Sequence, residues 1–258
     1  TRIGGQAVIE GVMMRGREMY CMAVRNPQGT LTVEKKAWKG LSSKGIFRLP
    51  ILRGIASFWD SLVSGTRILM RSAEIAGEGW EDEEPSKLEK FLIDKFGEKV
   101  NDILIYVTVI ISMAMGIGLF FLLPVLLGSF FSRFVPSWAL GIIESFIRIA
   151  IFLGYLFAIS RMKEIQRVFQ YHGAEHKTIN CFESEKELTV ENVRPCTRLH
   201  KRCGTSFLFF VIIISCIVFM FIQTTSVGDR LLLKLCLVPF IAGISYEVIR
   251  WAGNSDSP

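Results

Sequence analysis

Four long apolar segments alternate with charged stretches along the chain. They cover residues 103–127, 138–160, 206–224 and 231–251, and the first and third contain no Asp, Glu, Lys or Arg. A helix rises about 1.5 Å per residue, so about 20 residues cross the hydrocarbon core of a bilayer. Helices buried in a soluble domain rarely run so long without a charge. The pattern therefore predicts a membrane α-helical protein with a bundle of four transmembrane helices.

The stretches outside these segments predict a small cytoplasmic α+β part. Residues 1–40 combine a glycine-rich loop at 4–16, which contains a short strand, with a β-hairpin across the turn at 26–29. Residues 41–100 hold an amphipathic helical stripe and an acidic linker at 81–85. The stripe either lies in the membrane interface or packs on the bundle. The remaining divisions are two transmembrane helices in 101–160, a His/Cys loop in 161–205 and two transmembrane helices in 206–252.

The uneven distribution of charge predicts the orientation. The net charge is +6, and 25 of the 30 Lys and Arg residues lie in 1–100 and 161–205. Basic segments stay in the cytoplasm, so we expect both termini and the 161–205 loop on the cytoplasmic side of a multi-pass protein in the cytoplasmic membrane. The lipid bilayer is then its first partner. No nucleic-acid-binding motif is present, and the six cysteines, in a reducing compartment or in membrane helices, are expected to form no structural disulfide.

Charged residues inside the apolar segments need partners, because an unpaired charge in the bilayer is costly. Glu144 and Arg148 are four residues apart and are expected to pair on one helix face. Lys234 lies near the outer end of its helix and is expected to extend its amine to the interface. Glu247 lies near the cytoplasmic end of the last helix. Its partner is either Arg250 or the helix end, or a metal ion held by the neighbouring loop.

A candidate site lies in the 161–205 loop, which contains all three histidines of the chain. His172, Glu175 and His176 form the pattern H-x-x-E-H, the inverted form of a zinc-peptidase motif. On a helix the two histidines point to one face and can bind one divalent transition metal, with zinc the first choice. The carboxylate between them can then accept a proton from the attacking water. A purely structural histidine cluster is the alternative.

Further metal ligands can come from nearby or from the last helix. Cys196, His200 and Cys203 follow within 30 residues of the H-x-x-E-H pattern and offer nitrogen and sulfur donors. Glu247 is a candidate distal ligand of the histidine pair. The candidate metal ligands are therefore His172, His176, His200, Cys203 and Glu247.

Four motifs resemble those of the YqhQ family of bacterial membrane proteins. They are GGQAVIEGVMMR at 4–15, YHGAEHKTI at 171–179, RCGTSF at 202–207 and GISYEV at 243–248. This family is catalogued as a domain of unknown function and has been described as predicted metal-dependent enzymes. The resemblance implies a bacterial membrane protein and no particular substrate. It also implies that the following residues lie in family motifs: Glu10, Arg15, His172, Glu175, His176, His200, Cys203 and Glu247.

The leading hypothesis is a membrane-embedded, metal-dependent hydrolase, such as a peptidase, acting at the cytoplasmic face. Glu175, Arg15 and Glu10 are its candidate catalytic residues; Glu175 serves as the base and Arg15 binds substrate or oxyanion. The substrate would be a peptide or a small molecule. One alternative is a non-catalytic interaction or assembly protein, with a membrane-protein partner or a second copy of itself and a structural metal or histidine cluster. A small transporter with a polar path through Glu144, Arg148 and Glu247 is the other.

Overall fold

The chain folds into two compact units. The computed structural model describes residues 3–38, 40–41, 45–77, 100–200, 203–222, 224 and 226–253. The first unit comprises Thr1–Gly79, Leu156–Ser215 and Leu237–Pro258, and the second comprises Trp80–Tyr155 and Cys216–Cys236. The acidic segment at 81–85, predicted as a linker, lies outside the described residues.

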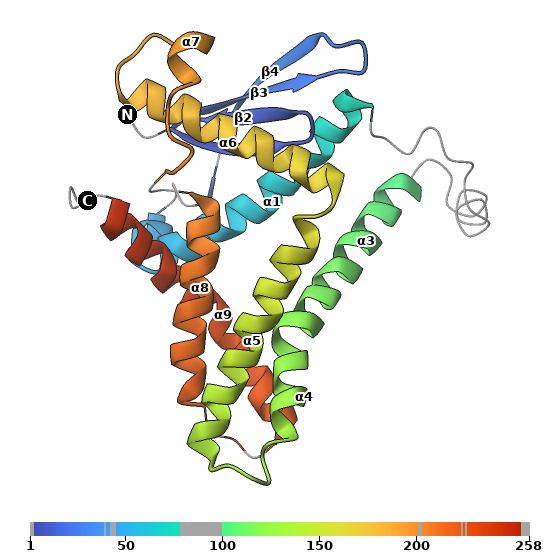
Figure 1. The fold of residues 1–258 in the computed structure, drawn as a ribbon, viewed down its shortest axis with the longest axis vertical. Helices are drawn as coiled ribbons and strands as arrows, with labels where there is room; N and C mark the ends of the chain where they lie inside the picture. Colours follow the sequence, from blue (N-terminus) through green and yellow to red (C-terminus); the bar gives the residue numbers. More distant parts are fainter. Residues whose placement is uncertain are drawn as a thin grey trace. The chain divides into compact units, whose positions relative to one another are not determined.

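A four-stranded antiparallel sheet opens the first unit, in the order β1-β2-β3-β4 (Figure 1). Its strands are β1 Gly4–Val8, β2 Gly11–Arg15, β3 Met19–Arg25 and β4 Leu31–Ala37. β3 and β4 form a hairpin across 26–29, where the sequence placed one. The prediction of a loop with one short strand at 4–16 is wrong, because this segment forms the β1–β2 hairpin.

The sequence did not predict that first hairpin, because the segment is rich in glycine, which is depleted in strands. Close packing requires them here. A Cβ atom on Gly11 would lie 2.9 Å from the Cα of Val24 in β3, and one on Gly5 would lie 2.6 Å from the Cδ of Glu175. The glycines therefore mark where other parts of the chain approach the strand backbone.

Two helices cover the two faces of this sheet. α1, Leu52–Ala76, contributes Ile68 to the core, which it shares with Val8, Met13, Met22 and Val24. These strand residues share one face, because side chains alternate along a strand and partners in register point the same way. Gly5 belongs to the opposite face and meets α6, Lys163–Glu183.

The segment at 161–205, predicted as a His/Cys loop between apolar helices, contains helices of its own. α6 occupies its first half, and the short helix α7, Val190–Val193, follows. Arg167 and Tyr171 of α6 bind Glu10 in the β1–β2 turn, so the helix is attached to the sheet. The histidine motif therefore lies on a rigid element.

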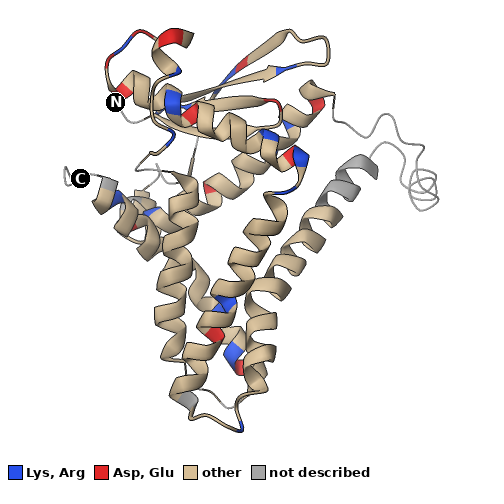
Figure 2. Cartoon of the chain, viewed as in Figure 1, with Lys and Arg blue, Asp and Glu red and all other residues tan. Residues whose placement is uncertain are grey.

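Long apolar helices make up most of the remaining chain, and charges are rare along them (Figure 2). They are α3 Val100–Ile117, continued by the π-helical turn η4 Gly118–Leu122 and by α4 Leu123–Ser129; α5 Ser137–Ile159; α8 Gly204–Met220; and α9 Val227–Gly253. Among the described residues, three stretches are long and apolar enough to cross a membrane: Val107–Ser129, Trp138–Ile159 and Val227–Ala252. α8 is apolar but only 17 residues long. Three candidate spans thus indicate a membrane protein, and the fourth crossing stays a prediction.

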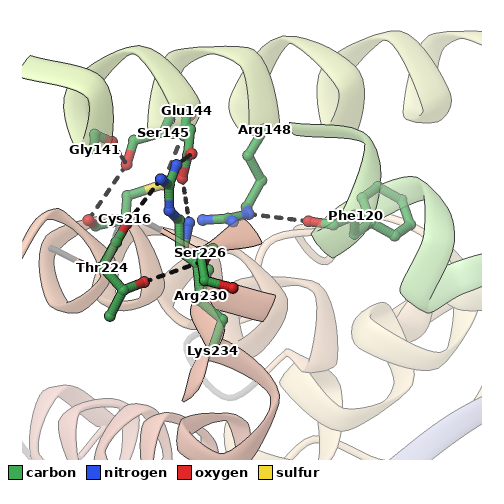
Figure 3. A network of polar contacts seen from close by, with 10 residues as sticks. All are labelled: Phe120, Gly141, Glu144, Ser145, Arg148, Cys216, Thr224, Ser226, Arg230 and Lys234. Atoms are coloured by element: carbon green, nitrogen blue, oxygen red, sulfur yellow. Dashed lines mark hydrogen bonds and ion pairs between the residues drawn. The ribbon is translucent and has the colours of Figure 1, made fainter. Parts of the chain in front are cut away.

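Two predicted placements of charge in these helices are wrong (Figure 3). Glu144 pairs with Arg230 and Lys234 of α9 rather than with Arg148. Lys234 is buried in this pair and does not extend to an interface. The i,i+4 rule describes isolated helices, whereas here a neighbouring helix supplies two cations for the same carboxylate.

Candidate metal centre

Two histidines and one cysteine meet between α6 and the start of α8. His172 and His176 are four residues apart on α6, so they share a face, and their ring centroids lie 4.3 Å apart. Cys203 immediately precedes α8. One donor atom from each of these three side chains lies within 4.8 Å of the other two. We call His172, His176 and Cys203 the His–Cys cluster.

The sulfur of Cys203 caps the start of α8. Its Sγ accepts a hydrogen bond from the backbone N–H of Thr205 at 3.3 Å and lies 2.9 Å from Thr205 Oγ1. It also lies 3.3 Å from His172 Nε2. Burial opposes ionisation of the thiol, but the hydrogen bonds from His172, Thr205 and the helix start outweigh it and lower the pKa of Cys203 to about 6. Cys203 is therefore a thiolate at neutral pH.

His172 is the cationic partner of this thiolate. Its hydrogen bond with Cys203, and then its contact with Glu175, raise the pKa of His172 to about 10 against the effect of burial. Without a metal ion, the pair is thus an imidazolium and a thiolate at neutral pH. A metal ion that binds here displaces the imidazole proton.

His176 is fixed by a backbone carbonyl. Its Nδ1 lies 2.6 Å from the carbonyl oxygen of Arg198, and because a carbonyl only accepts, Nδ1 carries the proton. This tautomer leaves Nε2 free to bind a metal ion. Asn180 holds the same segment by donating to the carbonyls of Thr197 and Leu199 at 2.8 and 3.0 Å.

Glu175 is a buried carboxylate beside the cluster. It is 3% exposed, and its Oε2 has no hydrogen-bond partner but lies 3.3 Å from His172 Nδ1. Its carboxylate packs against the backbone of Gly5, where any larger residue would collide with it. Sequence reasoning did not single out Gly5, and the only signal was the Gly-Gly pair that opens β1.

The donor set fits a zinc-like ion. Imidazole and thiolate are the ligands that zinc prefers, and donors around one tetrahedral zinc lie roughly 3.3–3.8 Å apart. The separations of up to 4.8 Å need only small side-chain movements to reach that geometry. Ligating histidines commonly donate their second ring nitrogen to a carboxylate, and Oε2 of Glu175, 3.3 Å from His172 Nδ1, takes that position behind His172.

The structure does not bring Glu247 to the His–Cys cluster. Both its carboxylate oxygens accept from Arg53 of α1, and Oε1 also lies 3.4 Å from the backbone N–H of Ile51. A Cβ on Gly54 would lie 2.8 Å from the Cα of Gly243, so the two helices touch at glycines beside this ion pair. Glu247 thus joins α1 to α9.

His200 lies next to the cluster without joining the group of three donors. Its ring centroid is 5.7 Å from that of His176, and its Nε2 lies 3.3 Å from Glu183 Oε2.

Glu10 and Arg15 have contacts elsewhere in the first unit. Glu10 accepts from Arg167 at 2.5 Å and from Tyr171 at 3.0 Å, and the hydrogen bond from Arg167 lowers its pKa. Arg15 stacks on Trp38, with its guanidinium carbon 4.5 Å from the ring centroid. Neither shows a contact with the His–Cys cluster among the described residues.

Comparisons with known proteins agree with the sequence motifs. The family described as "Protein of unknown function (DUF1385)" matches residues 49–258. The chain belongs to this family. It is also 37% identical over 254 residues to "Uncharacterized protein YqhQ" of Bacillus subtilis (strain 168), an alignment that covers 96% of this chain and 77% of that protein. The resemblance to the YqhQ family is therefore confirmed, whereas no solved structure matches significantly.

The family region contains every residue of the His–Cys cluster, and it also contains Glu144, Arg230 and Lys234. It begins after the sheet, so Gly5 lies outside it, although the alignment to the Bacillus subtilis protein reaches nearly the whole chain. The family description gives no activity, and the chemistry has to be argued from the geometry.

Proposed function

We propose that the protein is a membrane-embedded, metal-dependent hydrolase with its site at the cytoplasmic face. The observation that carries this proposal is the His–Cys cluster, in which three zinc-type donors lie within 4.8 Å of one another. Catalytic zinc sites commonly have three protein ligands and one open position, whereas structural sites use four. Three donors therefore favour the catalytic form.

The residues take separate roles in this proposal. His172 Nε2, His176 Nε2 and Cys203 Sγ would hold the ion, which when bound would polarise a carbonyl and activate water. Glu175 would accept the proton of the attacking water, because it is the buried carboxylate beside the cluster. Its Oε2 lies 3.3 Å from His172 Nδ1 and keeps that ring oriented. The substrate is a peptide or a small ester or amide.

The proposal includes four membrane crossings. α9 is a candidate span, and its far end is joined through Arg53 and Glu247 to α1, in the same unit as α6 and Cys203. If α9 crosses the membrane, its start at Val227 lies on the opposite side from Cys203. The chain must then also cross between these residues, and α8 is the helix there. Its 17 residues span about 25 Å, so the bilayer thins locally or flanking apolar residues complete the crossing.

The orientation follows from the basic residues. Most Lys and Arg residues precede the first span or lie between the second and third crossings, which supports a cytoplasmic location for the His–Cys cluster and both termini. In that compartment a free thiolate persists and remains available as a metal ligand.

Metal content is the test of this proposal. Wild-type protein purified in detergent should hold about one zinc or other transition-metal ion per chain, and the His176→Ala protein should hold none. His200→Ala is the matched control, because it removes a neighbouring imidazole from outside the three-donor group. Folded wild-type protein that takes up no metal on reconstitution would refute the metal centre.

A second variant separates catalysis from metal binding. Glu175→Gln should keep the ion and abolish hydrolysis of a peptide library, because the amide cannot accept a proton. If Glu175→Gln loses the ion instead, the carboxylate acts only by orienting His172.

A structural metal site in an interaction or assembly protein is the second candidate function, and the nearby ring of His200 favours it. That site would use His200 as a fourth ligand. His200→Ala would then lose the ion together with His176→Ala, whereas in the catalytic proposal only His176→Ala does.

A further inference from the structure

A second cluster of polar groups lies in the second unit, among the apolar helices (Figure 3). Glu144 of α5 accepts from Arg230 at 2.6 Å and also from Lys234. Arg148, one turn further along α5, is 3% exposed. We call Glu144, Arg148, Arg230 and Lys234 the α5–α9 charge cluster. Each of its four side chains is more than nine-tenths buried.

One guanidinium nitrogen of Arg148, Nε, has a hydrogen-bond acceptor in the protein. Pro124 has no N–H, so the carbonyl of Phe120, four residues earlier, lacks its usual helical donor. The helix forms a π-helical turn at this point, and Arg148 Nε donates to the Phe120 carbonyl at 3.0 Å. A proline-freed carbonyl inside an apolar helix is thereby satisfied.

The other two guanidinium nitrogens of Arg148 have no hydrogen-bond acceptor among the described residues. Nη1 and Nη2 are buried without a hydrogen-bond partner, and the guanidinium lies 4.7 Å from the ring centroid of Phe219. The thiol of Cys216 is close enough to interact with Arg148, but a thiol is a weak acceptor. Arg230 Nε is also buried and unpartnered.

The cluster therefore has too few acceptors for its donors. Both oxygens of Glu144 are used, by Arg230 and Lys234, and Arg230 uses one further acceptor, the carbonyl of Thr224 at 2.9 Å. Three cationic side chains face one carboxylate. An excess of buried positive charge in an apolar setting is costly, and such residues within membrane helices usually mark a binding site.

We propose that the α5–α9 charge cluster binds a phosphate-class oxyanion. Arginine forks match the paired oxygens of phosphate, and the unpartnered Nη1 and Nη2 of Arg148 form such a fork. A phosphate group also carries the one to two negative charges that the cluster lacks.

The anion can come from two sources. Arg230 lies three residues from the start of α9, Glu144 and Lys234 each lie seven residues from the start of their helices, and Arg148 lies eleven residues from the start of α5. At about 1.5 Å per residue, the cluster extends from about 5 Å to about 17 Å below the helix ends. A phospholipid headgroup drawn in from the membrane surface reaches Arg230 first, and free phosphate enters from the adjacent water.

Thermal unfolding of the full chain in detergent tests this proposal. We expect the wild-type Tm to rise by about 5 °C with saturating anionic phospholipid, compared with zwitterionic phospholipid of the same chain length. Inorganic phosphate is compared with chloride at equal ionic strength. Arg148→Gln should abolish the response, and Arg133→Gln, which removes an exposed arginine between α4 and α5, should leave it intact.

The outcomes separate the two sources. A response to phosphatidylglycerol alone supports a lipid headgroup, and a response to inorganic phosphate as well supports a free oxyanion. No response in wild type, or a full response in Arg148→Gln, overturns the proposal. If Arg148→Gln does not fold, Arg148→Lys replaces it, because it keeps the charge and removes the planar fork; an unchanged response there also overturns the proposal.

Discussion

The two polar clusters of this protein differ in what they lack. The α5–α9 charge cluster has more hydrogen-bond donors than acceptors, with Arg148 Nη1 and Nη2 unpartnered. The His–Cys cluster has the opposite composition, because the thiolate of Cys203 and the imidazole nitrogen of His176 are electron-pair donors and the buried carboxylate of Glu175 lies beside them. One cluster is suited to an anion and the other to a cation.

This contrast supports the ligand class that we propose for each cluster. Buried polar groups in folded proteins nearly always have partners, so an orphaned group indicates the charge of the missing one. The unpartnered cationic nitrogens of Arg148 are suited to an anion, whereas the imidazole and thiolate donors of the His–Cys cluster are suited to a soft cation. The predictions below test each side of this contrast.

The largest expected effect comes from removing the single acid of the α5–α9 charge cluster. Glu144→Gln leaves three buried cations without a counter-charge and should destabilise the protein by about 3–5 kcal/mol. Glu164→Gln, at an exposed acid on α6, should cost less than about 1 kcal/mol. Denaturation midpoints in detergent measure both. Added phosphate should restore more stability to Glu144→Gln than to wild type, and equal stabilities of the two variants would contradict the charge imbalance.

That pairing shows where sequence reasoning stopped. Neighbours on one helix were predictable, as His172 and His176 show, because the i,i+4 relation is fixed by helix geometry. Contacts between helices were not, because the chain gives no register between α5 and α9. The pairing of Glu144 with Arg230 and Lys234, instead of Arg148, could therefore not be predicted.

Glu247 and Gly5 teach the same lesson at the candidate metal centre. A carboxylate at the end of a span signals a need for a partner, but Arg53, nearly 200 residues earlier, supplied it. Gly5 looked like part of a flexible loop. The need for glycine there depends on the tertiary structure, in which α6 places Glu175 against the strand. Three of the four predicted spans and the residues of the His–Cys cluster could be found in the sequence, whereas the tertiary partners could not.

The next largest effect is on metal affinity. Cys203→Ser should weaken zinc binding by more than about 100-fold, because even outer-shell partners of a metal site cost about 10–100-fold when they are removed. Cys236→Ser is the matched control, since Cys236 is exposed on α9. Competition with a chromophoric chelator measures both affinities. Equal affinity in the two variants would remove Cys203 from the ligand set.

A smaller effect on the same affinity should come from the sheet. Gly5→Ala places a Cβ atom 2.6 Å from Glu175 Cδ, so the carboxylate must move away from His172. We expect zinc affinity to fall by about 10–100-fold. Gly4→Ala provides the control, because a Cβ there meets nothing within 4 Å. If both variants bind zinc like wild type, the orientation of His172 does not depend on Glu175.

The smallest effect is on the rate at which metal-free Cys203 reacts with a small aromatic disulfide. The hydrogen bonds from His172, Thr205 and the helix start lower its pKa to about 6 despite burial, so the thiolate forms as pH rises through 6 and the rate should reach half its plateau there. At pH 7 the thiolate fraction is about 100-fold higher than for a thiol with a pKa of 9.0. Weaker basicity reduces the intrinsic nucleophilicity of the thiolate about 20-fold, so the net acceleration is only about fivefold. His172→Gln removes the imidazolium and should shift the midpoint to higher pH. Zinc should suppress the reaction in wild type by occupying the sulfur, and an unchanged rate with bound zinc would mean that the thiolate lies outside the metal centre.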